Sequence, residues 1–311
     1  MLPKPTIGVI ACDLRQVYMA RMLAKEGYKI HLVYSSQLDK EKLCMIMLDC
    51  NSYEQSNLRI TSDITDILMS SDVIAGPVPF NKICEFITIP KFIQALINKN
   101  NTDKQAIHDS INYSLLYAGV IDSEYKTMLN EYGIDYVDFM EIEELAVFNT
   151  IATAEGIIAE AILHKETNLH GSECMVLGYG KCAKTLANKL KGIGANVTVV
   201  ARNPMDLTTA SSLGYSTLNI ASLKNHIYCF EYIFNTIPHM ILDSFVLEHV
   251  NKESVIFDIA SIPGGVDKQY ATKNGIRLVH SLGIPGKYAP KSSGEAIGEY
   301  LIEYINRKFN T

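Results

Sequence analysis

The chain has 311 residues, which is enough for about two domains of ordinary size. Hydrophobic residues make up 48% and charged residues 20%, with 19 glycines and 10 prolines, and these values exclude a disordered or fibrous chain. No apolar run approaches the ~20 residues needed to cross a bilayer, and the first residues do not form an apolar signal segment. We therefore expect a soluble, cytoplasmic protein with no membrane partner.

The charge and the cysteines narrow the class of partner further. The formal charge is -6, and residues 1–166 contain 14 lysines and arginines against 23 aspartates and glutamates, whereas residues 167–286 contain 10 against 8. No stretch dense in Lys and Arg carries interleaved aromatic residues, so we expect no nucleic-acid partner. The seven cysteines form no C-x-x-C pair, which argues against a disulfide framework or a zinc site and favours a reducing compartment.

The first half of the chain shows an α/β pattern. Residues 5–35 predict strand, helix and strand, and further strands are predicted at 72–75, 115–120 and 134–137 with amphipathic stretches between them. The asparagine-rich stretch at 98–102 predicts a surface loop.

A long helical pattern and a second α/β series follow. Apolar residues recur at intervals of three and four residues over 143–163, and this spacing predicts a rigid connector helix. The second series then predicts short, buried parallel strands that alternate with helices, at 174–177, 197–201, 216–218, 232–236, 254–259 and 276–280. A final helix at 294–309 is predicted to return and pack on the first domain.

The sharpest motif follows the first strand of this second series. It is a G-x-G-x-x-A loop with the sequence Gly178-Tyr179-Gly180-Lys181-Cys182-Ala183. Gly178 permits a tight turn, Gly180 lets the backbone approach a pyrophosphate, and Ala183 allows close packing of helix on strand. Because a helix begins there, its free N–H groups favour an anion. The alternative is a tight turn without a ligand.

The end of the next strand bears on the choice of nucleotide. NAD-binding sites usually have a carboxylate there for the ribose hydroxyls, but this strand ends Ala201-Arg202-Asn203. Arg202 can pair with a 2′-phosphate and stack on adenine. We therefore predict NADP as the cofactor, with NAD as the alternative, unless Arg202 is only a solvated loop residue.

Two later strand ends are predicted to face the same ligand crevice. Asn235-Thr236-Ile237-Pro238 ends one strand where a nicotinamide ribose commonly lies, and Asp258 to Asp267 ends the next with a run of turn residues. We include Ala260 and Ser261 of that run among the cofactor-binding residues.

These patterns predict one fold class and four divisions. The expected fold is α/β, with two Rossmann-like doubly wound domains joined by a long connector helix and a returning C-terminal helix. The predicted divisions are an N-terminal α/β domain for substrate or partner at 1–142, the connector helix at 143–166, an NADP-binding Rossmann domain at 167–286, and the returning segment at 287–311. A cleft between the two domains is expected to hold cofactor and substrate.

Several further motifs carry a family resemblance. The segments that carry it are Asp258-x-Ala260-Ser261-x-Pro263-Gly264-Gly265-x-Asp267, Gly283-Ile284-Pro285-Gly286 with Ala289-Pro290-Lys291-Ser292-Ser293-Gly294, Glu144-Leu145, Asn149 and Thr153 to Gly156 on the connector, Asp13-Leu14-Arg15-Gln16, and Gly76-Pro77-Val78-Pro79. Together they resemble the A subunits of dipicolinate synthase, over nearly the whole chain. Two positions depart from the pattern, since Ala11-Cys12 replaces a Gly-Gly pair and Gly76 replaces a larger residue.

This resemblance implies a function in spore formation. It implies oxidation of dihydrodipicolinate, or of its hydrated tetrahydro precursor, to dipicolinic acid in the mother-cell cytoplasm of a sporulating bacterium. It also implies the flavoprotein B subunit of that enzyme as partner, with FMN on that partner only, and leaves self-association open. Two alternatives remain, namely an NADP-dependent dehydrogenase for another small carboxylate and a non-catalytic NADP-binding scaffold for the flavoprotein.

The dicarboxylate substrate calls for cations and backbone N–H groups. Arg15, directly after the first strand, is the leading candidate, unless it is only a surface or helix-terminal charge. The predicted substrate-binding residues are Asp13, Arg15, Gln16, Pro77, Pro79, Pro285, Gly286, Lys291 and Ser292. The last two are expected in a loop that precedes the final helix, where Ser292 and Ser293 are also candidate helix caps.

Two residues are predicted to be catalytic. His239 is the one histidine at a strand end in the expected crevice, and Asp258 ends the following strand. Asp267, Glu155 and Asp13 are further candidate proton acceptors, and a structural role for His239 stays open. The scattered histidines predict no metal site.

Overall fold

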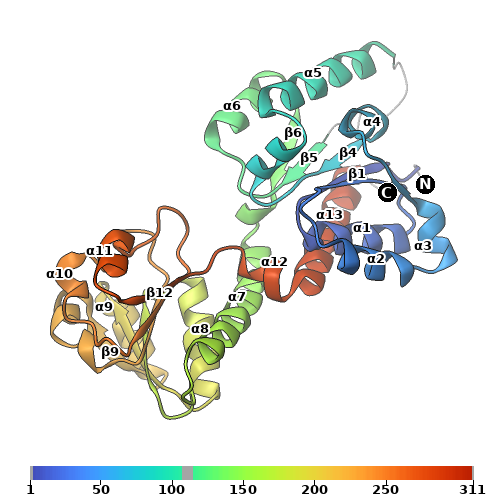
Figure 1. Cartoon of the computed structure of the whole chain (residues 1–311). Coiled ribbons are helices and arrows are strands. Elements are labelled where there is room, and N and C mark those ends of the chain that lie inside the picture. Colours follow the sequence, from blue (N-terminus) through green and yellow to red (C-terminus); the bar gives the residue numbers. More distant parts are fainter. Residues whose placement is uncertain (1–2, 107–114, 310–311) are drawn as a thin grey trace. The chain divides into compact units, whose positions relative to one another are not determined.

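The computed structural model describes residues 3–106 and 115–309, and these form two compact units. One unit contains Met1–Ala146 together with Pro290–Thr311, and the other contains Val147–Ala289. We call them unit 1 and unit 2 (Figure 1).

Unit 1 is built on a parallel sheet. Within the described residues, six strands lie in the order β3-β2-β1-β4-β5-β6, which is the order of a doubly wound nucleotide-binding fold. The elements are β1 (Ile7–Ala11), α1 (Leu14–Lys25), β2 (Ile30–Tyr34), α2 (Lys40–Leu48), α3 (Ser52–Asn57), β3 (Leu58–Ile60), α4 (Ile64–Ser70), β4 (Val73–Ala75), the 3₁₀ helix η1 (Phe80–Glu85), α5 (Ile89–Ala106), β5 (Leu115–Ala118), α6 (Ser123–Glu131), β6 (Asp135–Asp138), η2 (Phe139–Glu141) and α13 (Pro290–Phe309).

The two faces of this sheet carry separate apolar cores. Side chains alternate along a strand, so Ile7 and Val9 of β1 enter a core with α1, α2 and α13, whereas Ile10 enters a core with α4, α5 and α6. The returning helix α13 contributes Ile297 and Leu301 to the first of these cores, as expected from the sequence.

Unit 2 repeats the same architecture. Six described strands lie in the order β12-β11-β10-β7-β8-β9, and all neighbours are parallel. The elements are α7 (Glu143–His164), which begins in unit 1, β7 (Glu173–Leu177), α8 (Lys181–Gly192), β8 (Asn196–Ala201), α9 (Pro204–Ser212), β9 (Ser216–Asn219), η3 (Ile220–Asn225), η4 (Ile227–Cys229), β10 (Tyr232–Asn235), α10 (Ser244–Leu247), β11 (Val255–Asp258), α11 (Lys268–Lys273), β12 (Arg277–His280) and α12 (Ile284–Tyr288). Helices α7, α8 and α9 cover one face, and η3, η4, α10 and α11 cover the other. The predicted fold class is therefore confirmed.

Two sequence predictions about loops are wrong. Residues 98–102 lie inside α5, where Gln94 Nε2 donates to Asn98 Oδ1 at 3.0 Å and the buried Lys99 ammonium donates to the carbonyl of Ser71. The expected loop before the final helix is also helical, because α12 occupies part of it and α13 begins already at Pro290. Proline is favoured at the first position of a helix, where its missing N–H costs nothing.

Helix α7 corrects the expectation that no apolar stretch of the chain is long enough to cross a bilayer. It has 22 residues and, by length and composition alone, could cross a bilayer. In the fold, 56% of its most apolar stretch is buried, and it supplies Ile157 and Ala161 to the core of unit 2. Its apolar composition therefore has a structural explanation within the protein.

Candidate functional site

The glycine loop of unit 2 forms a tight turn at the end of β7. Gly178 has φ of 101°, and a Cβ there would lie 2.5 Å from Oγ1 of Thr236. The same hydroxyl donates to the carbonyl of Leu177 at 2.8 Å, so it cannot simply move aside. Only glycine fits this turn without strain.

Gly180 serves the other purpose expected of the loop. It is the N-cap of α8, no described heavy atom lies within 4 Å of a Cβ built on it, and no described side chain caps the helix. Ala183, one turn on, is fully buried against the sheet. The space beside Gly180 is thus open next to the positive end of the helix dipole, and an uncapped helix end of this kind is suited to a phosphate.

The remaining residues of the loop differ in exposure. Lys181 is exposed at the start of α8, and Cys182 is half-buried, where burial raises the pKa of its thiol. The ring of Tyr179 is buried in the core between sheet and helices, with Lys184 Nζ 5.1 Å from its centroid. Tyr179 therefore offers a nucleotide its backbone rather than its ring.

The end of β8 presents an uncommitted cation. Ala201 is buried, and Arg202 directly after it is exposed and makes no hydrogen bond or ion pair with any described residue. Asn203 accepts a hydrogen bond from Met205 N at 3.0 Å and so caps α9. The arginine side chain is therefore available to an anionic ligand at this strand end.

The ends of β10 and β11 are joined by a buried polar network. Asp258 is fully buried, and its Oδ1 accepts from Asn235 Nδ2 at 2.9 Å while its Oδ2 accepts from Gly265 N at 3.3 Å. Asn235 also donates to the carbonyl of Ile237 and accepts from the N–H of that residue, both at 3.1 Å. These bonds fix the loops 235–238 and 258–265, so the geometry gives Asp258 a positioning role.

The two predicted catalytic residues do not form a pair. His239 and Pro238 are exposed, and no described side chain bonds the His239 ring. The histidine that does approach Asp258 is His280 at the end of β12, whose Nδ1 lies 3.7 Å from Asp258 Oδ2. His280 is not among the residues predicted from the sequence for this site, although it ends a predicted strand. Ala260 is buried, and Ser261 is exposed on the outer side of the same loop.

In unit 1, the turn after β1 is closed by its own side chains. Asp13 caps α1 by accepting from Arg15 N at 3.0 Å, and Gln16 Oε1 accepts from Asp13 N at 2.9 Å and from Cys12 N at 3.3 Å. Backbone N–H groups at this helix end are therefore occupied by side chains. Unit 1 has the same strand order as unit 2, but its first helix is capped by side chains whereas α8 is not.

Arg15 ties this turn to the turn after β4. Its Nε and Nη2 donate to the two carboxylate oxygens of Asp13 at 3.0 and 2.7 Å, and Nη2 also donates to the carbonyl of Val78 at 3.1 Å. The Arg15 side chain is 8% exposed. Burial opposes ionisation of Asp13, but the Arg15 guanidinium outweighs it and holds the pKa of that carboxyl below its usual value. Because Nε and Nη2 of Arg15 already donate to Asp13, these two groups are not available to bind a substrate carboxylate.

The surroundings of this ion pair include a cation that the sequence analysis missed. Lys82 Nζ lies 3.6 Å from Asp13 Oδ2, and the Lys82 side chain is 38% exposed. Pro77 is buried and Pro79 is half-buried on the same turn. Burial raises the pKa of the Cys12 thiol beside them to about 12, which disfavours the thiolate.

The turn after β5 was also not anticipated. Asp138 accepts hydrogen bonds from the backbone N–H groups of Val120, Ile121 and Met140 at 2.9 to 3.1 Å, and from Lys126 Nζ at 3.0 Å. These bonds hold Val120 at φ of 55°, a conformation rare for a β-branched residue. Asp138 therefore shapes the strand end next to β4.

Pro285 and Gly286 lie in α12, which α7 holds in place. Glu160 of α7 is buried and accepts from Lys287 Nζ at 2.8 Å, from the Tyr288 hydroxyl at 3.0 Å and from the Ser281 hydroxyl. Lys291 and Ser292 are exposed in the first turn of α13 in unit 1. The sequence offered no signal for Glu160 beyond a carboxylate in an apolar helix.

Replacing Glu160 by glutamine is expected to destabilise unit 2 by about 2 kcal/mol at pH 7, since it removes charged hydrogen bonds from a buried site. Burial raises the pKa of Glu160, but its three hydrogen bonds outweigh burial and hold it below the usual value. The stabilisation is therefore complete above pH ~4.3 and disappears as the pH falls through the folded-state pKa. Denaturant titrations of both proteins from pH 7 to pH 3 measure this.

Glu155→Gln is the control for that experiment, because Glu155 lies on the same helix and forms an exposed pair with Lys189 at 2.8 Å. Its loss should cost less than about 1 kcal/mol. A Glu160→Gln effect that is constant from pH 7 to pH 3 would contradict the assignment.

Among residues 3–106 and 115–309, no group of three or more histidines, cysteines, aspartates or glutamates could hold a metal ion. The candidate site consists of loops and helix ends, and these indicate the class of protein. Unit 2 has the strand order and the glycine loop of a Rossmann-type nucleotide-binding fold, and a second α/β unit of the same strand order accompanies it.

Comparison with known proteins identifies the family. A family model for the N-terminal domain of the dipicolinate synthase A subunit matches residues 6–140. The chain is 31% identical over 305 residues to the dipicolinate synthase A subunit of Bacillus subtilis (strain 168), covering 98% of this chain and 97% of that protein. The chain belongs to the family of dipicolinate synthase A subunits, as its motifs predicted.

Solved structures agree with this assignment. The dipicolinate synthase A subunit from Bacillus halodurans has a TM-score of 0.79 at 27% identity, covering 98% of this chain and 99% of that one. The structure of the Bacillus subtilis protein has a TM-score of 0.78 at 28% identity, covering 99% and 97%. A transhydrogenase from Sinorhizobium meliloti has a TM-score of 0.64 at 16% identity, covering 96% and 94%, and shares the fold.

Proposed function

We propose that this chain oxidises dihydrodipicolinate, or its hydrated tetrahydro precursor, to dipicolinic acid with NADP, in the mother-cell cytoplasm of a sporulating bacterium. It does so in a complex with the flavoprotein B subunit of dipicolinate synthase, which carries the FMN. The observation that carries the proposal is the open helix end at Gly180, with the uncommitted Arg202 on the next strand. Membership of the dipicolinate synthase family supports the choice of substrate.

The chemistry asks the protein mainly to hold its reactants. Dihydrodipicolinate loses a hydride and a proton, and aromatisation of its ring supplies much of the driving force. NADP supplies the hydride acceptor when it is bound. In this proposal the turn 178–183 holds the pyrophosphate, Arg202 holds the 2′-phosphate, and the strand ends at Thr236 and Ser261 flank the nicotinamide ribose. The proton leaves to solvent or to a base. His280 is a candidate for that base in addition to His239.

Unit 1 would recognise the substrate through the ends of β1 and β4. Since Arg15 is paired with Asp13, it acts as a positioning residue, and the half-exposed Lys82 is the cation left to meet a carboxylate. Gln16, Pro77 and Pro79 shape the surface around it, and Pro285, Gly286, Lys291 and Ser292 remain proposed substrate residues.

One observation favours a second function. Asp258 has its acceptors filled by backbone and amide groups, and His239 faces solvent, so neither residue is arranged as a general acid or base. This favours a nucleotide-binding protein without chemistry of its own, which would hold NADP for the flavoprotein.

The deciding experiment follows the ultraviolet spectrum of dipicolinate formed from freshly generated dihydrodipicolinate and NADP. The chain is tested alone and then with the flavoprotein. Product from the chain alone supports the first function, whereas product only with the flavoprotein supports the dependent role. No product in either case overturns both.

Arg202→Ala is expected to weaken NADP binding about tenfold or more and to leave NAD binding unchanged, because charged hydrogen bonds to the 2′-phosphate are lost. Calorimetric Kd values for both nucleotides test this. Lys224→Ala is the control, because Lys224 lies in the same unit and contacts the Phe245 ring instead. An unchanged ratio of the two Kd values for Arg202→Ala would show that this residue does not select the nucleotide.

A further inference from the structure

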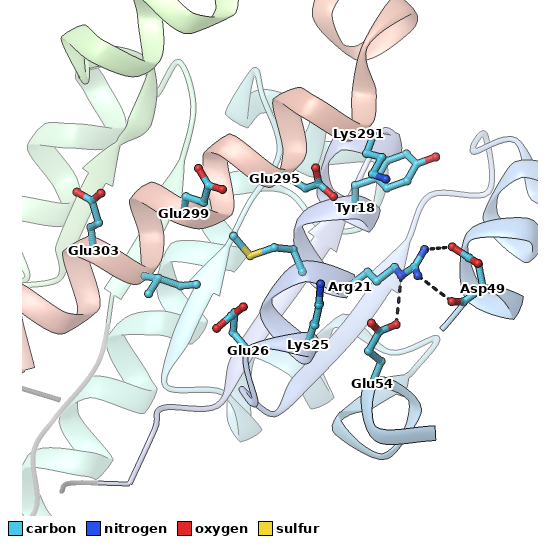
Figure 2. Close-up of a pocket in the computed structure, with 12 residues that line it drawn as sticks. Tyr18, Arg21, Lys25, Glu26, Asp49, Glu54, Lys291, Glu295, Glu299 and Glu303 are labelled. Atoms are coloured by element: carbon cyan, nitrogen blue, oxygen red, sulfur yellow. Dashed lines mark hydrogen bonds and ion pairs between the residues drawn. The ribbon is translucent and has the colours of Figure 1, made fainter. Parts of the chain in front are cut away.

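Unit 1 carries a groove whose lining, apart from Lys291, the proposed chemistry does not use. It has a volume of about 580 Å³ and lies between α1 and α13, with the ends of α2 and α3 on one side (Figure 2). Met22 of α1 and Ile302 of α13 are half-buried and, with Tyr18, are the lining residues without a charge. A groove lined mainly by charged residues with a few apolar ones is suited to an amphipathic segment of a protein.

The walls of this groove are held rigidly by close helix packing. A Cβ on Gly294 of α13 would lie 2.2 Å from the carbonyl oxygen of Arg15, and one on Gly298 would lie 3.3 Å from atoms of Met19 and Met22. These glycines let the two helices approach each other closely. The close approach of α1 and α13 therefore sets the shape of the groove.

Its charge is strongly uneven. The described residues that line it include three cations and six carboxylates, namely Arg21, Lys25, Lys291, Glu26, Asp49, Glu54, Glu295, Glu299 and Glu303. Arg21 is already committed, at 2.5 Å to Asp49 and 3.2 Å to Glu54, as the dashed lines in Figure 2 show. The remaining charged residues of the lining are Lys25 and Lys291 against Glu26, Glu295, Glu299 and Glu303, so carboxylates outnumber cations there by four to two.

Three of these carboxylates form a stripe along α13. Glu295, Glu299 and Glu303 recur every four residues and so lie on one face of the helix. Among the described residues, no ion pair involves Glu295 or Glu299, whereas Glu303 pairs with Arg307 at 2.9 Å. Like charges four residues apart destabilise a helix, so the stripe has a local cost that a cationic ligand would relieve. It extends about 12 Å, or two helical turns.

We propose that this groove docks a cationic amphipathic segment of the flavoprotein partner. That segment presents lysine or arginine side chains at matching spacing to the stripe, and an apolar side chain to Met22 and Ile302. The inference rests on the proposed function, in which the flavoprotein and this chain form a complex.

The test measures the Kd between the full chain and the flavoprotein by calorimetry, at low and at moderate salt. The double variant Glu295→Gln/Glu299→Gln is expected to weaken the complex about tenfold at low salt and to reduce its salt dependence, since charges at an interface rim govern both. Both residues belong to unit 1 and the glycine loop belongs to unit 2, so nucleotide binding is expected to be unchanged.

The matched control is Glu124→Gln/Glu131→Gln, which removes two exposed carboxylates from α6 in the same unit. It should leave the Kd unchanged. Equal Kd values for wild type and the α13 variant would overturn the groove assignment while leaving the proposed function intact. If the wild-type chain forms no complex with the flavoprotein, the groove assignment is also overturned. If the chain alone then still turns over substrate, the proposed oxidation reaction stands. Sedimentation of the chain alone shows whether a second copy fills the groove instead, which would also overturn the assignment.

Discussion

Gly180→Val is expected to leave the free protein folded and to weaken nucleotide binding by at least about 100-fold. A Cβ at this position meets no described atom within 4 Å, so the larger side chain has room in the unliganded protein. The same side chain would occupy the space in which a pyrophosphate approaches the helix N–H groups. The loss is therefore steric and confined to the ligand. NADP titration by calorimetry measures it, and thermal unfolding checks the fold.

Gly192→Val is the matched control, since Gly192 ends the same helix and a Cβ there also meets no described atom within 4 Å. It should bind nucleotide like the wild type. Gly178→Val differs from both, because its strained φ and the nearby Thr236 hydroxyl predict a loss of stability as well. If Gly180→Val binds NADP normally, the helix end is not the phosphate site.

Arg15→Ala is expected to destabilise unit 1 by about 3 kcal/mol and to lower its melting temperature by about 10 °C. The substitution leaves the carboxylate of Asp13 in a largely buried site with only the more distant Lys82 as a counterion. It also removes the bond to Val78 that joins the turns after β1 and β4. Denaturant unfolding followed by circular dichroism measures the change, because the chain has 17 tyrosines but no tryptophan for fluorescence.

A double-mutant cycle with Asp13→Asn isolates the ion pair. Asparagine caps a helix as well as aspartate does, so this substitution removes the charge and keeps the cap. The double variant should be more stable than the sum of the single losses predicts, with a coupling of about 2 kcal/mol. NADP binding should be unchanged throughout, because Gly178 to Ala183 belong to unit 2. Additive losses would mean that Arg15 and Asp13 do not act as a pair.

The strands of both units could be predicted because each is a short apolar run between turn residues. Ile7 to Ile10 and Cys174 to Leu177 show this most clearly, and parallel strands covered on both faces require such runs. Residues 98–102 could not be assigned in the same way. Asparagine has weak helix propensity, and what continues α5 is a tertiary contact, the burial of Lys99 against the Ser71 carbonyl.

The candidate site was predictable where backbone geometry alone requires a residue type. Gly178 and Gly180 belong to this group, because a positive φ and the close approach of a ligand to the backbone each favour glycine, which is visible in the sequence. The positions of Glu160, Asp138 and His280 require no particular residue type in this way. Each acts through partners far away in the chain, as Glu160 does with Lys287, and the residue type alone does not reveal which residue is the partner. Arg15 was recognised, but its pairing with Asp13 depends on side-chain direction.

The division of unit 1 into two chain segments has a consequence for biosynthesis. Unit 2 is continuous in sequence and can fold as soon as Ala289 has left the ribosome. Unit 1 lacks Ile297, Leu301 and Ile305 of its own core until α13 has been synthesised. The core around β1 and α1 is therefore completed only after unit 2 has been made. During that interval their exposed apolar face is the part of the nascent protein most in need of a chaperone.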